Sequence, residues 1–340
     1  MKPDSTARRL AVAGAALSAA AAALLGLALL AGASPFDALR SLADGAVGSN
    51  AALGETLARA TALVLTATGA SLAFRAGVLN IGLEGQFLAG ALAAAAVGPP
   101  LSGAPFLARA TLLAAGALAG ALWVLPAAYL EARRAVPEVL STILLNLIAA
   151  ATVSGLVRGA LQDPEGDYPQ SRALPEAVRL APLVAGSRVT AAILVALAMA
   201  LLVTLVLGRT PLGLKLRATG LAPAAARAIG LPGARLRLLA FAASGALAGL
   251  AGGLEVLAVT GRLYDPFSPG SGYTGIAAAL LGGSHPLGAA ASALFFAALG
   301  AGSSAMQRDT GVPGALATIV PGVLVLAVLA ARARLTPKDA

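Results

Sequence analysis

The chain has 340 residues, of which 58% are hydrophobic and only 11% are charged, and its net charge is +9. Soluble globular domains carry about 25% charged residues, so this composition excludes an ordinary soluble domain and indicates a membrane protein. Because there is no cysteine and only one histidine, disulfides, thiol catalysis and multi-histidine metal sites are excluded as well. The positive charge does not form a basic groove interleaved with aromatic residues, so no nucleic acid partner is expected.

Apolar runs recur along the whole chain and predict an all-α, polytopic transmembrane bundle of about ten spans (eight to ten), each able to cross about 30 Å of hydrocarbon. The first run follows the basic start MKPDSTARR but is longer than the core of a signal peptide, so we interpret it as a retained helix. The eighth run is short enough to be re-entrant. The ten runs are residues 10–32, 57–74, 79–98, 107–130, 139–160, 190–208, 237–260, 273–284, 287–305 and 315–331.

The distribution of charge predicts the orientation of these spans. With the amino terminus inside, basic residues concentrate on the inner side, whereas basic and acidic residues balance outside, as the positive-inside rule requires. Both termini are therefore predicted to be cytoplasmic, as tails of residues 1–9 and 332–340. The outer loop of residues 162–188 has mixed charge and four prolines.

The inner loop of residues 209–237 is strongly basic. It has no acidic residue, and its basic residues are Arg209, Lys215, Arg217, Arg227, Arg235 and Arg237. Within it, Ala222 to Ile229 is compatible with a short helix, because Pro223 lies near the start and Gly230 at the end, as capping preferences favour. Neither this loop nor the outer one is long enough to form a catalytic domain.

Polar residues interrupt the apolar runs at a few places. An ionisable residue inside a span costs roughly 2.5–3.5 kcal/mol on insertion scales, so it usually faces a cavity or a partner. Glu84 lies in the stretch NIGLEGQ, where Gly82 and Gly85 allow the backbone to leave a regular helix. Glu84, Asn80 and Gln86 either line a solute path or join helices through hydrogen bonds, and the sequence leaves both interpretations open.

Four further polar residues are candidates for the solute path. Glu255, near the outer end of the seventh run, either contacts solute or places its carboxylate among lipid headgroups. Asn146 either contacts solute or joins helices, as amides do in membranes. Ser268 and Tyr273 belong to the proline- and glycine-rich stretch LYDPFSPGSGYTG that precedes the eighth run.

Two patterns repeat along the chain. The pentapeptide GALAG occurs at Gly116–Gly120 and at Gly245–Gly249, a small-residue spacing that we interpret as close helix packing. Runs two to five and runs seven to ten each begin with a long helix followed by a glycine-rich polar break, and they are predicted to have opposite directions. Transporters are often built from such inverted repeats, so we predict one here.

Motifs narrow the class of membrane protein. The chain has no Walker A pattern, no zinc-binding motif and no serine nucleophile elbow, so no enzymatic activity is expected. Two classes remain. One is a proton-coupled secondary transporter, in which a buried carboxylate relays protons; the other is a passive subunit driven by an ATPase on another chain.

The stretch FRAGVLNIGLEGQFLAGALAA closely resembles the signature of ABC-importer permeases of the branched-chain amino acid, simple-sugar and nucleoside group. Further similar stretches follow in the family's order, and the resemblance covers roughly residues 55–332. The sequences NIGLEGQ and STILLN most resemble those of the nucleoside permeases, with ribose-type sugar permeases next and branched-chain amino acid permeases more distant. The similar stretches are VPEVLSTILLNLIA, GLKLRATGLAPAAARAIGLPGARLRLLAFAASGALAGLAGGLEVL, SPGSGYTGIAAALLGGSHPLGAAASALFFAAL and MQRDTGVPGALATIVPGVLVL.

The resemblance implies a bundle like that of type II ABC importers, forming one permease domain over residues 1–340 in a bacterial cytoplasmic membrane, with the spans in residues 10–331. It also implies a second permease subunit, a paralogue, together with a cytoplasmic ATPase and an extracytoplasmic substrate-binding lipoprotein. ATP and Mg²⁺ would bind the ATPase, and no cofactor is expected in this chain. The inner loop would then couple this chain to the ATPase, with Arg217, Ala224, Arg227 and Gly230 as the expected contact residues.

Overall fold

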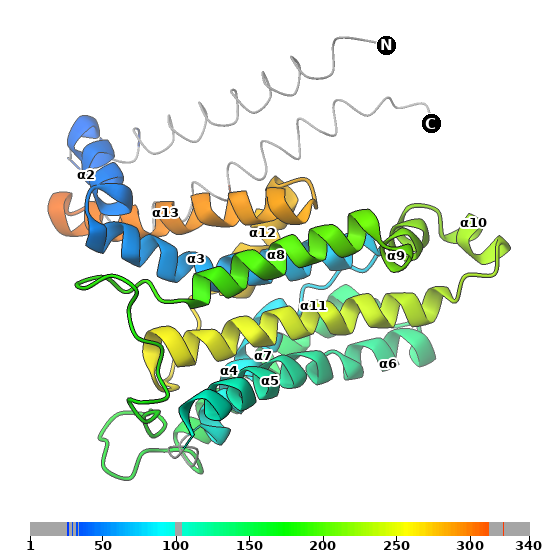
Figure 1. The fold of residues 1–340 in the computed structure, drawn as a ribbon, viewed down its shortest axis with the longest axis horizontal. Helices are drawn as coiled ribbons and strands as arrows, with labels where there is room; N and C mark the ends of the chain where they lie inside the picture. Colours follow the sequence, from blue (N-terminus) through cyan, green and yellow to red (C-terminus); the bar gives the residue numbers. More distant parts are fainter. Residues whose placement is uncertain are drawn as a thin grey trace. The chain divides into compact units, whose positions relative to one another are not determined.

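The computed structural model describes residues 34–98 and 104–312, with the isolated residues Gly26, Leu29, Gly32 and Gly322 (Figure 1). Every regular element in these ranges is a helix, which confirms the all-α prediction there; strand pairing is limited to isolated bridges. The elements are α2 (Pro35–Val47), α3 (Asn50–Arg75), α4 (Leu83–Val97), α5 (Pro105–Trp123), α6 (Leu125–Arg134), α7 (Glu138–Val157), α8 (Ala192–Arg209), α9 (Pro211–Leu221), α10 (Pro223–Ala228), α11 (Gly233–Glu255), the π-helix η1 (Val256–Thr260), α12 (Ser271–Leu281) and α13 (Pro286–Thr310).

Six helical stretches among the described residues are long and apolar enough to cross a membrane: Asn50–Arg75, Pro105–Arg134, Glu138–Val157, Ala192–Arg209, Gly233–Thr260 and Pro286–Thr310. They match the predicted runs at 57–74, 107–130, 139–160, 190–208, 237–260 and 287–305. The runs at 79–98 and 273–284 correspond to the shorter apolar helices α4 and α12. At about 1.5 Å per residue, neither helix alone crosses about 30 Å of hydrocarbon. The runs at 10–32 and 315–331 lie outside the described residues.

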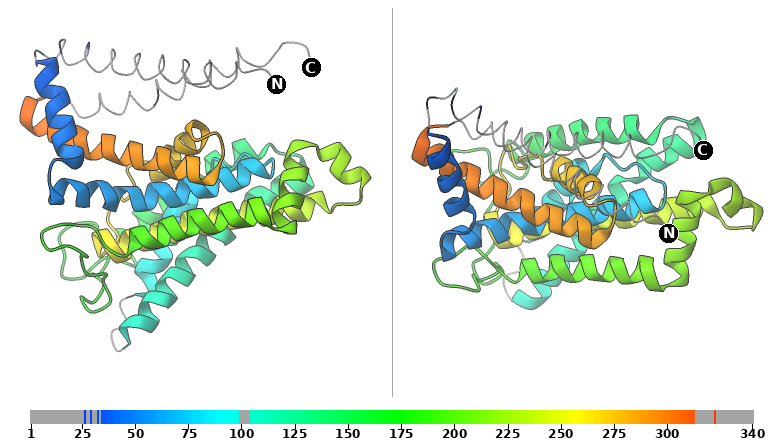
Figure 2. Two further views of the ribbon diagram at one scale, coloured as in Figure 1. Left: turned by 45° about the horizontal axis from the view of Figure 1, so that its top comes forward. Right: turned by 90° about the horizontal axis from the view of Figure 1, so that it is seen from above.

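The chain divides into two compact units, one made of Met1–Thr56 with Phe295–Ala340 and the other of Leu57–Leu294. In the larger unit, α11 packs against α4 and α5, α4 also packs against α7, and α12 packs against α4. Figure 2 shows α9 and α10 at the end of α8 that is farther from the α7–α8 loop. All residues of the candidate site described below lie in this unit.

Glycines bring α4, α5 and α11 to backbone contact. A Cβ atom added at Gly249 would lie 2.8 Å from the Cα of Gly120, and one added at Gly120 would lie 2.7 Å from the Cα of Gly249. Gly90 of α4 is similarly close to the backbone of Gly249. The interpretation of the GALAG pentapeptides as close helix packing is therefore confirmed.

The smaller unit contains α2, a helix that hydropathy did not predict. The Ser34 side chain accepts a hydrogen bond from the Asp37 N–H at 3.4 Å, and Pro35 occupies the first helical position, so the start of α2 has both preferred capping features. Ala38 packs with Met306 and Val312 in a small apolar cluster. The local signal was present in the sequence, but α2 is too short and too polar to be detected as a span.

The element order of the two halves repeats. The long helix α3, an irregular segment, the short helix α4 and the long helix α5 correspond to α11 with η1, a second irregular segment, α12 and α13. Both short helices are preceded by irregular backbone, as predicted from the glycine-rich breaks. The opposite direction of the two halves stays a prediction.

Candidate functional site

The irregular residues 76–82 between α3 and α4, here called the break segment, contain the most extensively hydrogen-bonded of the predicted polar residues. Asn80 is fully buried. Its amide donates to Gln86 Oε1 and to Ser244 Oγ, both at 2.9 Å, and its oxygen accepts from Gln86 Nε2 and the Gly82 N–H, both at 3.0 Å. Asn80 thus joins the break segment to α4 and to α11, and its hydrogen-bonding capacity is used within the protein.

Asn146 makes the corresponding connection to α7. It is buried, and its oxygen accepts from the Gly85 N–H at 2.8 Å. Its amide donates to the Ile81 carbonyl at 2.9 Å and to the Tyr273 hydroxyl at 3.1 Å. One side chain therefore links α7 to the break segment, to the first turn of α4 and to α12.

Glu84 joins the two short helices. Its carboxylate accepts from the Gly272 N–H at 2.7 Å, in the first turn of α12, while Glu84 itself lies in the first turn of α4. Helix amino termini have unpaired N–H groups and a partial positive charge, so they stabilise a carboxylate. Glu84 is only 6% exposed, and this geometry favours the helix-joining interpretation.

The other predicted path residues have more contact with the surroundings. Tyr273 is 45% exposed, and its hydroxyl accepts from the amide of buried Asn146. The Ser268 hydroxyl accepts from the N–H groups of Gly270 and Ser271 and thus holds the start of α12. Glu255, the last residue of α11, is half-buried and directly precedes η1. Only Tyr273 combines exposure with a hydrogen bond to the network.

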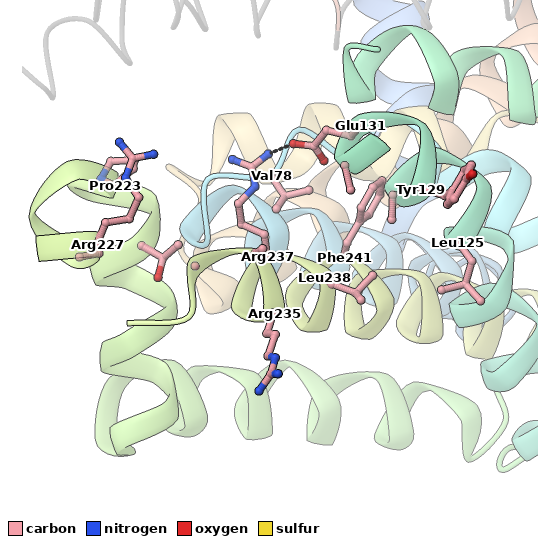
Figure 3. Close-up of a pocket in the computed structure, with 16 residues that line it drawn as sticks. Val78, Leu125, Tyr129, Glu131, Pro223, Arg227, Arg235, Arg237, Leu238 and Phe241 are labelled. Atoms are coloured by element: carbon pink, nitrogen blue, oxygen red, sulfur yellow. Dashed lines mark hydrogen bonds and ion pairs between the residues drawn. The ribbon is translucent and has the colours of Figure 1, made fainter. Parts of the chain in front are cut away.

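The predicted inner helix is confirmed as α10, which ends just before Gly230 at φ +77°. Ala224, Arg227 and Gly230 are exposed, whereas Arg217 in α9 is partly buried and its Nε has no hydrogen-bond partner among the described residues. A cavity of about 790 Å³ lies between α6, α10 and α11 (Figure 3). Arg227, Arg237, Glu131 and Tyr129 belong to its lining.

Sequence reasoning missed several partners of the predicted residues. Ser244 lay in a small-residue run and Gly272 contributes only its backbone, so no local signal identified either as a partner. Arg237 was interpreted only as part of the positive inner loop. Its guanidinium instead bonds Glu131 and Glu138, two acids that could have been recognised as candidate partners only by knowing which helices are neighbours.

An ion pair connects α7 to the segment that precedes α12. The Ser154 hydroxyl and the Arg158 guanidinium, each 2.7 Å from Asp265 Oδ2, hold the pKa of the Asp265 carboxyl below its ordinary value. A lowered pKa in the folded state contributes stability above about pH 3.8, the ordinary value, and that contribution is lost as the pH falls through the folded pKa. The interaction is therefore fully present at neutral pH.

Replacing Asp265 by asparagine is expected to speed hydrogen exchange in residues 261–270 at pH 7 by less than about fivefold. The effect is small because Arg158 is largely exposed, and exposed ion pairs contribute less than about 1 kcal/mol. Hydrogen exchange with mass spectrometry measures it. Asp167→Asn, at an exposed position without an ion pair among the described residues, is the control. Equal exchange in the two variants would show that the contact does not hold the segment.

Comparison with known proteins identifies the family. The family described as "Branched-chain amino acid transport system / permease component" matches residues 52–329. The chain belongs to this family of ABC transporter permeases. Such a subunit is not catalytic, and the ATPase is a separate subunit. Family membership removes the proton-coupled alternative, and the chain is a multi-pass membrane protein.

Individual relatives of this permease differ in the solute that they are named for. The chain is 35% identical to a glucose ABC transporter permease protein of Haloferax volcanii, over 90% of this chain and 84% of the relative. It is 33% identical to a guanosine ABC transporter permease protein of Bacillus subtilis, over 88% and 86%. A second guanosine permease protein of the same organism is 31% identical, over 71% and 78%. No solved structure matches the chain.

Proposed function

We propose that this permease imports nucleosides, using ATP hydrolysed on a separate subunit. The observation that carries a neutral solute with a face for stacking is the exposed side chain of Tyr273 beside buried Asn146, and the guanosine relatives favour a nucleoside among such solutes. A nucleoside is neutral, and it presents a flat base that can stack on an aromatic ring together with hydroxyls that need donors and acceptors. The resemblance of the two guanosine permease proteins supports the same solute class.

The sugar alternative is favoured by the glucose permease protein of Haloferax volcanii. A sugar also has hydroxyls and an apolar face that stacks on a ring, so Tyr273 suits both solutes. A branched-chain amino acid fits less well. A branched-chain amino acid is zwitterionic, so its ammonium group needs an acidic partner. The buried candidate, the Glu84 carboxylate, already accepts a hydrogen bond from the Gly272 N–H.

The assembly that we propose has two permease subunits, an ATPase and an extracytoplasmic substrate-binding lipoprotein. Bacillus subtilis has two guanosine permease proteins that both resemble this chain, which supports a paralogous second permease. Exposed α10 would contact the ATPase through Ala224, Arg227 and Gly230, with Arg217 behind them in α9. The chain would form one permease domain in the cytoplasmic membrane, with both termini inside.

The solute path in this proposal passes Tyr273, and the break segment bends the bundle beside it. Asn80, Glu84, Gln86 and Asn146 hold that bend. Glu255 and Ser268 lie farther along the chain towards the outer side, where solute would enter. Movement of α10 by the ATPase would alternate access to the two sides.

Uptake of radiolabelled solutes by cells with and without this subunit tests the solute class. We expect guanosine or adenosine uptake to be lost on deletion, and to be competed by other nucleosides but not by glucose, ribose or leucine. Unchanged nucleoside uptake with a loss of glucose or ribose uptake would instead establish the sugar alternative.

Removing the ring of Tyr273 is expected to lower nucleoside uptake about 5- to 150-fold, because stacking of a base on an aromatic side chain contributes about 1–3 kcal/mol. Tyr273→Ala loses the ring, whereas Tyr273→Phe keeps it and loses only the hydroxyl that bonds Asn146. Transport rates at several solute concentrations measure both. If the two variants have equal defects, the ring does not stack on solute.

A further inference from the structure

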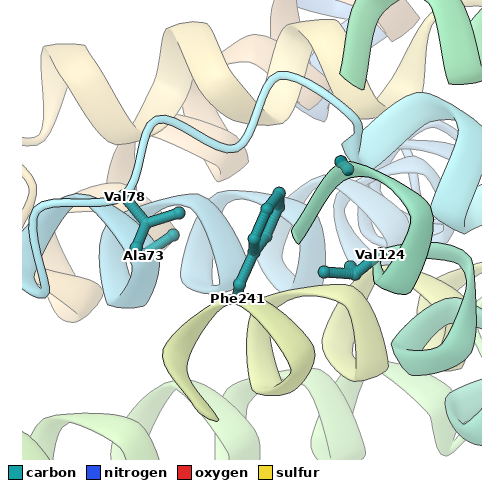
Figure 4. Packing of buried hydrophobic residues seen from close by; sticks show 5 residues of the cluster. Ala73, Val78, Val124 and Phe241 are labelled. Carbon is teal, nitrogen blue, oxygen red and sulfur yellow. The ribbon is translucent and has the colours of Figure 1, made fainter. Parts of the chain in front are cut away.

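Three residues of the break segment, Gly77 to Leu79, are held from several sides. Arg237 Nη1 donates to the Gly77 carbonyl at 3.1 Å, and Glu138 Oε1 accepts from the Leu79 N–H at 2.7 Å. Between them, the Val78 side chain is buried against Phe241 in an apolar cluster (Figure 4). We call these three residues and their bonds to Arg237 and Glu138 the clamp.

Arg237 is the centre of the clamp. Its Nη2 donates to Glu131 Oε1 at 2.6 Å, the contact drawn in Figure 3. The same Nη2 donates to Glu138 Oε2 at 2.9 Å, so one guanidinium connects α11, α6, α7 and the Gly77 backbone. Its side chain is 33% exposed and that of Glu138 is 12% exposed. The planar fork of arginine fixes several acceptors in one geometry, which a lysine ammonium does not. The clamp therefore holds the segment in one defined position.

The inner loop contacts the clamp directly. Gly220 of α9 lies against the backbone of Arg75 to Gly77, where an added Cβ would lie 2.7 Å from the Gly77 nitrogen. Backbones that approach this closely leave no room for even a methyl group between them, so they transmit displacement without side-chain rearrangement. A shift of α9 and α10 therefore displaces Gly77.

The network of buried amides begins immediately after the clamp. Leu79 precedes Asn80, which holds α4 and α11, and Ile81 bonds Asn146 of α7. Through Asn146 the connection reaches Tyr273 in α12. A continuous set of contacts thus runs from α9, through Gly77 to Leu79, to the helices around the proposed solute path.

We propose that Arg237 is a positioning residue for coupling: it ties the break segment to α6, α7 and α11, so that movement of α9–α10 reorients α4 and α12 together. The inference rests on the proposed contact between α10 and the ATPase and is independent of the solute. Coupling requires a structural connection whose position depends on both the ATPase contact and the helices around the solute path, and the clamp is such a connection. Without it, α9 moves and the polar network does not follow.

The test uses Arg237→Lys in the complete complex, reconstituted in lipid vesicles with its second permease, ATPase and binding protein. We expect the ATPase to co-purify and hydrolysis to stay within about twofold, while guanosine transported per ATP falls about tenfold, a typical coupling free energy. If the uptake assay identifies a sugar as the solute, glucose replaces guanosine in this measurement. Lysine keeps the positive charge between Glu131 and Glu138, so the fold is retained.

Arg235→Lys is the matched control, because Arg235 is exposed two residues earlier in α11 and has no hydrogen bond or ion pair among the described residues. It should transport and hydrolyse as the wild type does. Glu138→Gln is a second variant, expected to lower transport per ATP in the same direction. Normal transport per ATP in both clamp variants would overturn the proposal, as would an equal loss in Arg235→Lys. The α10 contact is tested separately with Arg227→Glu. If the ATPase fails to co-purify with this variant but does co-purify with the clamp variants, the contact between α10 and the ATPase is supported independently of the clamp.

Discussion

Replacing Gly249 by alanine is expected to destabilise the permease by about 1–3 kcal/mol or more, because the added methyl group would overlap backbone atoms of α5. A Cβ at Gly249 would lie 2.8 Å from the Cα and 2.9 Å from the nitrogen of Gly120. Neither atom can rotate away, so α5 and α11 must separate and lose their packing. The amount of folded subunit in membranes and its thermal unfolding in detergent measure the effect.

Gly253→Ala is the matched control in the same helix. There the nearest atom to an added Cβ is the Leu112 carbonyl oxygen at 3.7 Å, an ordinary van der Waals distance. This variant should unfold within about 0.5 kcal/mol of the wild type, as substitutions without a specific defect do. Similar stability of the two alanine variants would mean that α5 and α11 do not approach as closely as described.

Replacing Asn80 by leucine is expected to remove both stable assembly and uptake. Leucine has a similar size but no polar atoms, so the Gln86 amide, the Ser244 hydroxyl and the Gly82 N–H all lose a partner in a buried site. Each buried group left without a hydrogen bond costs about 1–3 kcal/mol, and three such groups approach the whole stability of many domains. Thermal unfolding of the purified subunit and solute uptake measure the two losses.

Two further leucine variants provide an intermediate case and a control for this experiment. Asn146→Leu leaves the Gly85 N–H and the Ile81 carbonyl without their partner and should be intermediate, because partly exposed Tyr273 can bond water instead. Asn50→Leu replaces an exposed side chain and should have no effect. If Asn80→Leu were as stable as Asn50→Leu, the buried amides would not hold the break segment.

Much of the fold could be predicted from the sequence, because hydrophobic length is a local property. Long apolar runs gave six helices of spanning length among the described residues, and Pro223 with Gly230 located α10. The glycines and polar residues of NIGLEGQ correctly located the departure from a regular helix. The resemblance identified the family, which residue chemistry alone had left open.

The partners of the polar residues could not be predicted, because they are distant in the sequence. Asn80 and Ser244 are 164 positions apart, and Glu84 and Gly272 are 188 apart. Hydropathy and spacing report on one helix at a time and carry no information about which helices become neighbours. For the same reason Arg237 was counted as a loop charge, although its guanidinium lies between Glu131 and Glu138.

The hydrogen bonds around the break segment bear on where solute selectivity would reside in this chain. Asn80 bonds Gln86 and Ser244, Glu84 bonds the Gly272 N–H, and Asn146 bonds the backbone and the Tyr273 hydroxyl, so all of these bonds are made within the protein. Relatives named for glucose and for guanosine resemble this chain to almost the same degree. In the proposed path, solute therefore meets this network at exposed Tyr273, whose hydroxyl accepts from the Asn146 amide.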